Sequence, residues 1–411
     1  MRKRKTLSVV VTILMLGTGA IADSKLVNNV EEMFSEGQVS GQIRVGHISY
    51  QTKVVGSKDT SATAIGGQLK FETGSLHGIS FGAAAYTSQD IKALSGDQGD
   101  GKFATDLSSS QRNYTEMAEA YINYANGGFN FRGGRQLIDT PLADSDDIRM
   151  TPHTFEAYVA SYALEELGLT FVGANLQRWQ GVDSDYANVT SSGWAETGVE
   201  GTWMGAALYE KDNITAAIWY YDVDKSVKAT YADITYTMDI ESDVTVTLGA
   251  QYLHENETDN SGIDGTIAGV MVEAEIGSLT LIGAYNTVSV DDGKSIFEGF
   301  GGGSSYTNID TNGAGFLHDG TSGDGASYVL ATGYEISSVN FIAVYGDYKA
   351  DSLANGNGKQ HATEINLGAE YSYNDGEIEA SIYYVIGEDK ESSTQTDKDD
   401  DHFQVTLNYN F

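Results

Sequence analysis

One segment gathers charged residues around the only two prolines of the chain. It reads DTPLADSDDIRMTPHTFEAY and contains Pro141 and Pro152. Because proline fixes φ and cannot donate a backbone hydrogen bond, the segment is stiffened at two points. Carboxylates held on a rigid support beside a guanidinium can sort small ions by charge, whereas the same residues on a free loop would only be solvated. The candidate residues are Asp139, Asp144, Asp146, Asp147 and Arg149.

The other reactive residue types form no site for bond-breaking chemistry. The seven histidines are scattered, without an i, i+4 pair or a serine at catalytic spacing. Cysteine is absent, which excludes disulfides and thiolate metal sites. The glycine-rich stretch 299–303 (GFGGG) lacks the lysine and hydroxyl of a phosphate-binding loop, so we interpret it as a flexible spacer. The sequence therefore predicts a protein that is not an enzyme.

An acidic stretch near the carboxyl terminus is the remaining candidate for metal binding. Asp397, Asp399 and Asp401 have the spacing of the first three ligands of an EF-hand loop, but His402 replaces the glycine and no glutamate follows at position twelve. A solvated acidic loop is the favoured interpretation. We therefore expect no cofactor, with a loosely bound divalent cation such as calcium as the alternative.

The elements that must position the charged segment are strands. From Phe403 to Phe411 apolar and polar residues alternate without a fault, as on a strand between lipid and water. An aromatic carboxyl-terminal residue is typical of the closing strand of a bacterial outer-membrane barrel. Tyr409 and Phe411 are therefore predicted to form the barrel-assembly signal.

The same alternation recurs in eighteen segments, most of them long enough to cross a bilayer when tilted. This predicts an all-β fold, a transmembrane antiparallel β-barrel of about 18 strands, which is wide enough to enclose water. The segments are 39–48, 62–73, 79–88, 114–125, 129–137, 156–164, 168–177, 202–209, 213–222, 227–239, 243–253, 266–276, 279–288, 326–336, 339–348, 362–373, 377–387 and 403–411.

The lengths of the connections between strands distinguish the two ends of the predicted barrel. Short connections such as 126–128 and 277–278 alternate with long ones such as 89–113 and 289–325. Outer-membrane barrels have short periplasmic turns and long extracellular loops. The proline-containing connection is then the third extracellular one, and residues 136–156 are predicted to fold inward as the constriction loop.

The amino terminus predicts export. Four basic residues precede an apolar run from Leu7 to Leu16 and a small-residue stretch, the pattern of a secretory signal peptide. We expect cleavage after Ala22, with residues 1–22 as signal peptide and 23–411 as a single barrel domain. The expected location is the bacterial outer membrane.

Parity along the predicted strands assigns side chains to the lumen. Acidic residues outnumber basic ones there, and the formal net charge of the chain is −34, which disfavours nucleic acid and anionic partners. We predict a water-filled pore that prefers cations or zwitterions with a positive group. The predicted pore-lining residues are Arg44, Glu119, Arg132, Arg135, Asp233, Glu273, Glu275, Glu370 and Glu379, with Gly133 and Gly134 leaving the side taken by Arg135 less well defined.

Three motifs carry a resemblance to a known family. They are Gly37–Arg44 (GQVSGQIR), Phe131–Gln136 (FRGGRQ) and Asp146–Phe155 (DDIRMTPHTF). With them the chain resembles the OprD-type outer-membrane porins, and most closely the major outer membrane porins of campylobacter-like bacteria. The resemblance implies an 18-stranded barrel and passive diffusion of small hydrophilic solutes, often cations. It also implies that Arg132 and Arg135 belong to a basic track in the lumen, and Asp146, Asp147 and Arg149 to the constriction.

The expected partners are small hydrophilic solutes and cations, outer-membrane lipid and lipopolysaccharide, and the barrel-assembly machinery. A homotrimer is the expected assembly of one branch of that family, whereas other members are monomers. The main alternative function is a surface-exposed adhesin or structural barrel whose lumen is occluded. Channel conductance would separate the two.

Overall fold

The computed structural model describes residues 25–53, 56–184, 193–291, 293–297, 299–301, 303–309, 324–350, 360–390 and 400–411. The predicted signal peptide, residues 1–22, lies outside these ranges. No helix in them is both long and apolar enough to cross a membrane.

Eighteen long strands make up most of the described residues. They are β2 (Gln38–Thr52), β3 (Thr60–Glu72), β5 (Ile79–Asp90), β6 (Asn113–Asn126), β7 (Phe129–Gln136), β8 (Thr154–Leu164), β9 (Leu169–Gln180), β11 (Thr202–Lys211), β12 (Ile214–Val223), β13 (Val227–Glu241), β14 (Val244–Glu257), β15 (Gly265–Ile276), β16 (Leu279–Val290), β17 (Gly325–Ile336), β18 (Val339–Ala350), β19 (Gln360–Tyr373), β20 (Ile378–Asp389) and β21 (Asp400–Asn410).

Shorter elements flank these strands. They are β1 (Leu26–Val27), α1 (Val30–Ser35), β4 (Ser75–Leu76), η1 (Lys92–Leu94), η2 (Glu165–Leu167), β10 (Ala195–Glu196) and η4 (Asn374–Gly376). Helix α1 precedes the first long strand, and its N-cap Asn29 accepts a hydrogen bond from the backbone N–H of Glu32. Phe34 of this helix stacks on Phe71 of β3.

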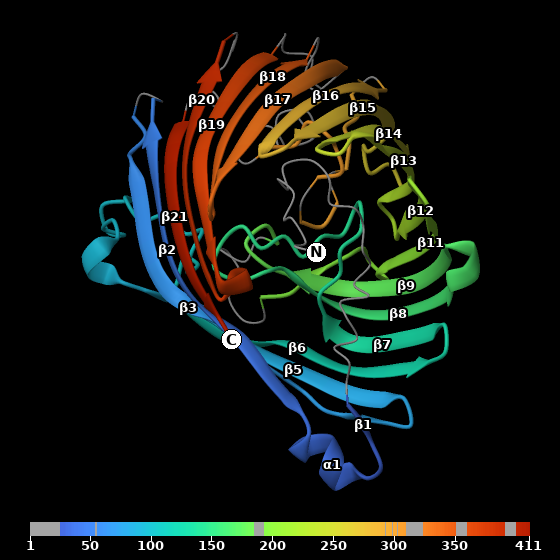
Figure 1. Ribbon diagram of the computed structural model, residues 1–411. Helices are drawn as coiled ribbons and strands as arrows, with labels where there is room; N and C mark the ends of the chain where they lie inside the picture. The colour runs from blue at the N-terminus through green and yellow to red at the C-terminus, as the bar shows by residue number, and fades with distance from the viewer. Residues whose placement is uncertain are drawn as a thin grey trace.

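The long strands form one closed antiparallel barrel. Each pairs with its neighbours in the ring, and β2 pairs with β21 from Gln42↔Asn410 to Thr52↔Asp400, which joins the first long strand to the last. Figure 1 shows this ring of strands with segments of loop in its interior. The predicted 18-stranded antiparallel barrel is therefore confirmed, and each of the predicted segments corresponds to one long strand.

The two faces of the strands differ as the alternation requires. On β14, Leu248 and Tyr252 are exposed on the outer surface, whereas Gln251 and Leu253 are buried on the opposite face. Large exposed hydrophobic side chains recur at alternating positions around the ring, for example Val270 and Val272 on β15. We call this face outward, because it suits contact with lipid, and the opposite face, against which loops pack, inward.

Deleting Phe411 is expected to lower the amount of folded barrel in the outer membrane several-fold. Its backbone N–H donates to the Gly41 carbonyl at 3.0 Å, and its ring stacks on Tyr409 on the outward face. Heat-modifiable mobility of the barrel in gels measures the folded fraction. Phe341→Ala is the matched control, since Phe341 is an outward phenylalanine of β18 with the same exposure. Normal assembly after the deletion would contradict the predicted signal.

Candidate functional site

The connection between β7 and β8, residues 137–153, folds against the inward face of the barrel; we call it the third loop. Its central anchor is Arg44 of β2, whose side chain is 4% exposed. Arg44 donates from Nη1 to Asp147 Oδ1 at 2.6 Å and from Nη2 to Asp147 Oδ2 at 2.8 Å. It also donates to the Arg149 carbonyl at 2.5 Å and, through Nε, to Asn408 of β21 at 2.8 Å. A planar guanidinium that meets a carboxylate in this paired way fixes both distance and orientation.

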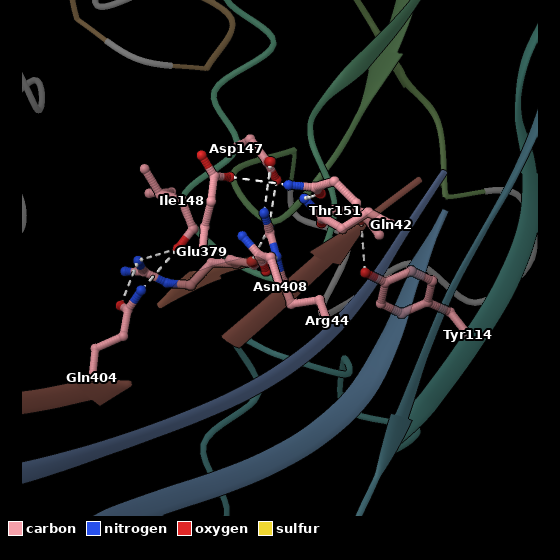
Figure 2. A network of polar contacts seen from close by, with 11 residues as sticks. Gln42, Arg44, Tyr114, Asp147, Ile148, Thr151, Glu379, Gln404 and Asn408 are labelled. Atoms are coloured by element: carbon pink, nitrogen blue, oxygen red, sulfur yellow. Dashed lines mark hydrogen bonds and ion pairs between the residues drawn. The ribbon is translucent and has the colours of Figure 1, made fainter. Parts of the chain in front are cut away.

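Two further contacts join the third loop to the wall. Gln404 of β21 donates to the Ile148 carbonyl at 3.1 Å and accepts a hydrogen bond from Arg149 at 3.2 Å. Tyr114 of β6 and Thr151 share a hydrogen bond between their hydroxyls of 2.8 Å. Figure 2 shows these side chains reaching the loop from different strands. The loop is therefore held at several points rather than projecting into solvent.

Buried apolar residues of the third loop support these polar anchors. Leu142, Ala143 and Met150 are almost completely buried. Met150 lies above Gly46 of β2, where a Cβ atom would come within 2.9 Å of its sulfur. A larger residue at position 46 would force the Met150 side chain to move. The stiffened loop predicted from its prolines is thus packed against the barrel wall. It runs from Leu137 to His153, which is shorter than the predicted range 136–156, because β7 includes residue 136 and β8 includes residues 154–156.

The loop after β16 also folds inward and pairs with the third loop. Phe300 donates its backbone N–H to the Leu142 carbonyl at 3.0 Å, and its carbonyl accepts from the Asp144 N–H at 3.0 Å. Gly301 has φ +74°, and a Cβ atom there would lie 2.3 Å from His153 Nδ1. The interpretation of stretch 299–303 as a flexible spacer is therefore wrong for its described residues: the glycines there allow close packing.

Trp179 of β9 joins both loops to the wall. Its ring is stacked on Phe155 of β8 with centroids 6.1 Å apart. It meets His153 of the third loop edge-on at 5.4 Å and Phe300 of the loop after β16 at 5.8 Å. The four rings form one aromatic cluster, so displacement of either loop would open an apolar surface to water.

The carboxyls of the third loop lie in a partly desolvated, acidic environment. Burial, with the charges of Asp144 and Asp183 added to it, raises the pKa of Asp146 to about 7. Burial likewise raises the pKa of Asp144 to about 6, and it raises the pKa of Asp139 above its ordinary value. Burial also lowers the pKa of His153. Asp146 and Asp144 therefore change charge close to neutral pH.

Basic side chains of the inward face lie on the strands of the first half of the chain, and two of them, Arg44 and Lys70, contact acidic partners. Lys70 of β3 contacts Glu119 of β6 at 3.0 Å, and Glu119 also accepts from the Tyr86 hydroxyl. Arg132 of β7 donates to Asn123 at 3.3 Å and lies over the Tyr121 ring at 4.4 Å. Together with Arg44 these residues make a basic wall, in which Arg44 and Lys70 are paired with carboxylates and Arg132 contacts an amide and an aromatic ring.

The inward face from β11 to β21 is acidic. The three lysines within these strands, Lys211, Lys228 and Lys349, all lie on the outward face according to strand register. Glu370 accepts from the Tyr383 hydroxyl and Glu379 from Asn410, so both lie inside the barrel. The inward carboxyl groups of these strands include Asp233, Glu255, Glu273, Glu275, Glu364, Glu370 and Glu379.

The prediction that Arg135 lines the pore is wrong. Strand β7 stays in continuous register with β8 through Gly133 and Gly134, so the alternation that starts with outward Phe129 continues to Arg135. Its register partner is Glu156, on the same outward face as the exposed Tyr158. The two glycines carry no side chain to reveal this from sequence. All other predicted pore-lining residues lie on the inward face.

Metal ligation is not apparent in the described ranges, where no group of three or more histidine, aspartate or glutamate side chains has a suitable arrangement. Most of the acidic stretch considered for calcium, including Asp397 and Asp399, falls outside the described residues. The expectation about a loosely bound divalent cation there stays a prediction.

Sequence reasoning missed the aromatic residues that hold the loops. Trp179 is the next-to-last residue of β9, and one of its ring contacts, Phe300, lies more than a hundred positions away in the chain. Tyr306 comes from a glycine-rich polar connection and packs against Gly249 of β14, where a Cβ atom would meet its hydroxyl at 3.0 Å. Large aromatic residues inside an otherwise polar loop were the available signal.

Comparison with known proteins agrees with this architecture. The model of the family described as outer membrane porin, OprD family, matches residues 32–411. The crystal structure of OccAB4 of Acinetobacter baumannii superposes with a TM-score of 0.77 at 15% identity, covering 91% of this chain and 98% of that one. OpdK of Pseudomonas aeruginosa, solved with vanillate, gives 0.75 at 16% identity, covering 92% and 99%. OccK8 (OprE) of the same species gives 0.73 at 13% identity, with coverage of 92% and 99%. At these identities the likenesses establish the fold alone. No curated protein matches the sequence.

Proposed function

The chain belongs to the OprD family of outer membrane porins, and from this premise we propose that its channel prefers cations and zwitterions with a positive group over anions. The protein forms an outer-membrane β-barrel channel for small solutes. Vanillate accompanies OpdK in the solved structure, and at 16% identity that ligand is not carried over to this chain.

The distribution of charge on the inward face supports cation preference. The strands from β11 to β21 carry no inward lysine or arginine. Carboxylates such as Glu273 and Glu275 of β15 therefore face no basic side chain from these strands. The basic wall contributes less, because Arg44 and Lys70 are paired with Asp147 and Glu119. Charged groups around a narrow aqueous path, with low-dielectric walls, raise the local concentration of ions of opposite sign.

Cation preference predicts a definite reversal potential. We expect purified full-length protein in a planar bilayer under a potassium chloride gradient to show a reversal potential displaced toward that of potassium. The displacement should shrink as ionic strength rises, because the Debye length falls from about 10 Å at 0.1 M to about 3 Å at 1 M. A reversal potential at zero, or one displaced toward chloride, would contradict the proposal.

Selectivity should also depend on pH near neutrality. The pKa values of Asp146 and Asp144 are about 7 and about 6, so both carboxyls gain a proton as the pH falls from 8 to 5. This removes negative charge from the third loop, and cation preference should decrease over that range. Reversal potentials at pH 8 and pH 5 measure the change. The pair of substitutions Asp144→Asn and Asp146→Asn should reduce this change; an undiminished change in that variant would place the titrating groups elsewhere.

The adhesin alternative predicts a folded barrel that conducts no ions. Family membership favours the channel over it. The rest of the proposal concerns partners: we expect export through a cleaved signal peptide, recognition by the barrel-assembly machinery, contact with lipopolysaccharide and, as in one branch of the family, a homotrimer. From its three motifs we also propose that the chain groups with the major outer membrane porins of campylobacter-like bacteria.

A further inference from the structure

Helix α1 carries an apolar stripe that the barrel covers only in part. At about 3.6 residues per turn, Val30, Met33 and Phe34 lie within an arc of about 100° around the helix. Glu31 and Ser35 lie on the other, polar side of the helix. Met33 is 4% exposed, whereas Val30 and Phe34 are 60% and 58% exposed. The stripe is therefore half covered by the barrel and half open.

Contacts with the barrel fix the orientation of this stripe. Strand β1, which precedes the helix, pairs with β4, and the Gly74 N–H donates to the Met33 carbonyl at 2.8 Å. Phe34 stacks on Phe71 of β3 with ring centroids 6.5 Å apart. Phe71 is the register partner of Val39, which is 61% exposed on the outward face. Figure 1 shows α1 outside the ring of strands. The open part of the stripe is thus continuous with the outward surface of the barrel.

Aromatic pairs at the short-turn end of the barrel indicate the level of the helix in the membrane. The rings of Tyr124 and Phe129 lie 6.3 Å apart beside the short turn between β6 and β7, and those of Tyr409 and Phe411 lie 6.2 Å apart at the end of β21. Both pairs face outward, and the stacked pair formed by α1 and β3 lies at the same end, beside the start of β2. Girdles of aromatic residues mark the membrane interfaces of such barrels, and their short turns are periplasmic. Helix α1 is therefore level with the interface of the periplasmic leaflet.

We propose that Val30 and Phe34 insert into the periplasmic leaflet and contact a zwitterionic phospholipid at the boundary between its headgroup and its acyl chains. An amphipathic helix on a membrane surface buries its apolar side chains at that boundary. Residues 25–36 contain three glutamates and one lysine, so attraction to anionic headgroups does not hold the helix there. The contact depends on apolar burial instead. It lies outside the lumen and does not rest on the proposed cation preference.

Site-directed spin labelling tests this contact, because the chain contains no cysteine. Val30→Cys and its matched control Ser35→Cys each place one nitroxide on α1, on sides about 140° apart. The full-length protein is reconstituted into phosphatidylcholine vesicles, and collisions of the nitroxide with oxygen and with a water-soluble nickel chelate are measured. We expect the ratio of oxygen to nickel collisions to be several-fold higher in Val30→Cys than in Ser35→Cys. It should approach the ratio in Leu248→Cys, because Leu248 is an exposed outward residue of β14 and serves as the lipid-facing reference.

Three outcomes would overturn the proposal. Equal ratios in Val30→Cys and Ser35→Cys would mean that the helix does not present its apolar stripe to lipid. Dipolar broadening in Val30→Cys that disappears on dilution with unlabelled protein would mean that a second copy of the chain covers the stripe. A higher ratio in vesicles that contain anionic phosphatidylglycerol would mean that charged headgroups hold the helix. Both substituted side chains are exposed, and heat-modifiable mobility confirms that each labelled variant is a folded barrel.

Discussion

Replacing Arg44 with alanine should release the third loop and change the channel more than any other single substitution in the lumen. Arg44 supplies four hydrogen bonds, three of which reach Asp147 and Arg149 of the loop. Charge-assisted hydrogen bonds contribute about 1.5–3 kcal/mol, and the exposure of Asp147 argues for the lower part of this range. A loss of about 2 kcal/mol raises the population of the undocked loop about thirtyfold.

Single-channel recording measures this effect. We expect larger and more variable conductance steps, because Asp147 and Arg149 no longer hold the loop against β2. Arg135→Ala is the control, because it removes the same side chain from the outward face, where no contact with the third loop exists among the described residues. Wild-type steps in Arg44→Ala would mean that the apolar contacts alone dock the loop.

Replacing Trp179 with alanine should destabilise both inward loops together. Its ring is 7% exposed and contacts His153, Phe155 and Phe300. Truncation of a buried tryptophan costs about 3–5 kcal/mol, because packing is lost and a cavity remains. The midpoint of thermal or denaturant unfolding should fall, and open-channel noise should rise as the loops separate.

Trp203→Ala is the matched control for this substitution. Trp203 lies on the neighbouring strand β11 but faces outward and is 66% exposed. Its loss leaves no buried cavity, so we expect a change in stability within about 1 kcal/mol. If both variants lose the same stability, the cost is a general one for tryptophan in this barrel and the aromatic cluster has no special part in holding the loops.

The barrel itself could be predicted from the sequence because its signal is local. A strand buried between lipid and water must alternate apolar and polar residues with a period of two, whatever its partners are. Residues 403–411 show this most clearly, and the eighteen alternating segments became the eighteen long strands. The two prolines likewise marked the stiff third loop, since proline restricts the backbone at its own position.

The function and the charged residues of the lumen could be predicted only in part from this alternation. Parity placed Arg44, Glu119 and Glu273 on the inward face, yet it could not reveal that Arg44 and Lys70 have acidic partners while the wall from β11 to β21 lacks bases. Balance of charge depends on contacts between strands and loops that are far apart in the chain. The sequence established most of the charges that enter the lumen, with Arg135 as an exception, and the structure established which of them are neutralised.

The sequence by itself determined the closed barrel, its long-loop end and the inward side of most charged residues, because alternation and turn length follow from the geometry of single strands. Only the tertiary structure decided that the loop after β16 packs on the third loop, that Trp179 joins both, and that Arg135 faces outward. The physical reason is that loop conformation depends on long-range packing. At Arg135 the local signal also fails, since Gly133 and Gly134 interrupt the pattern of side chains that would reveal its face.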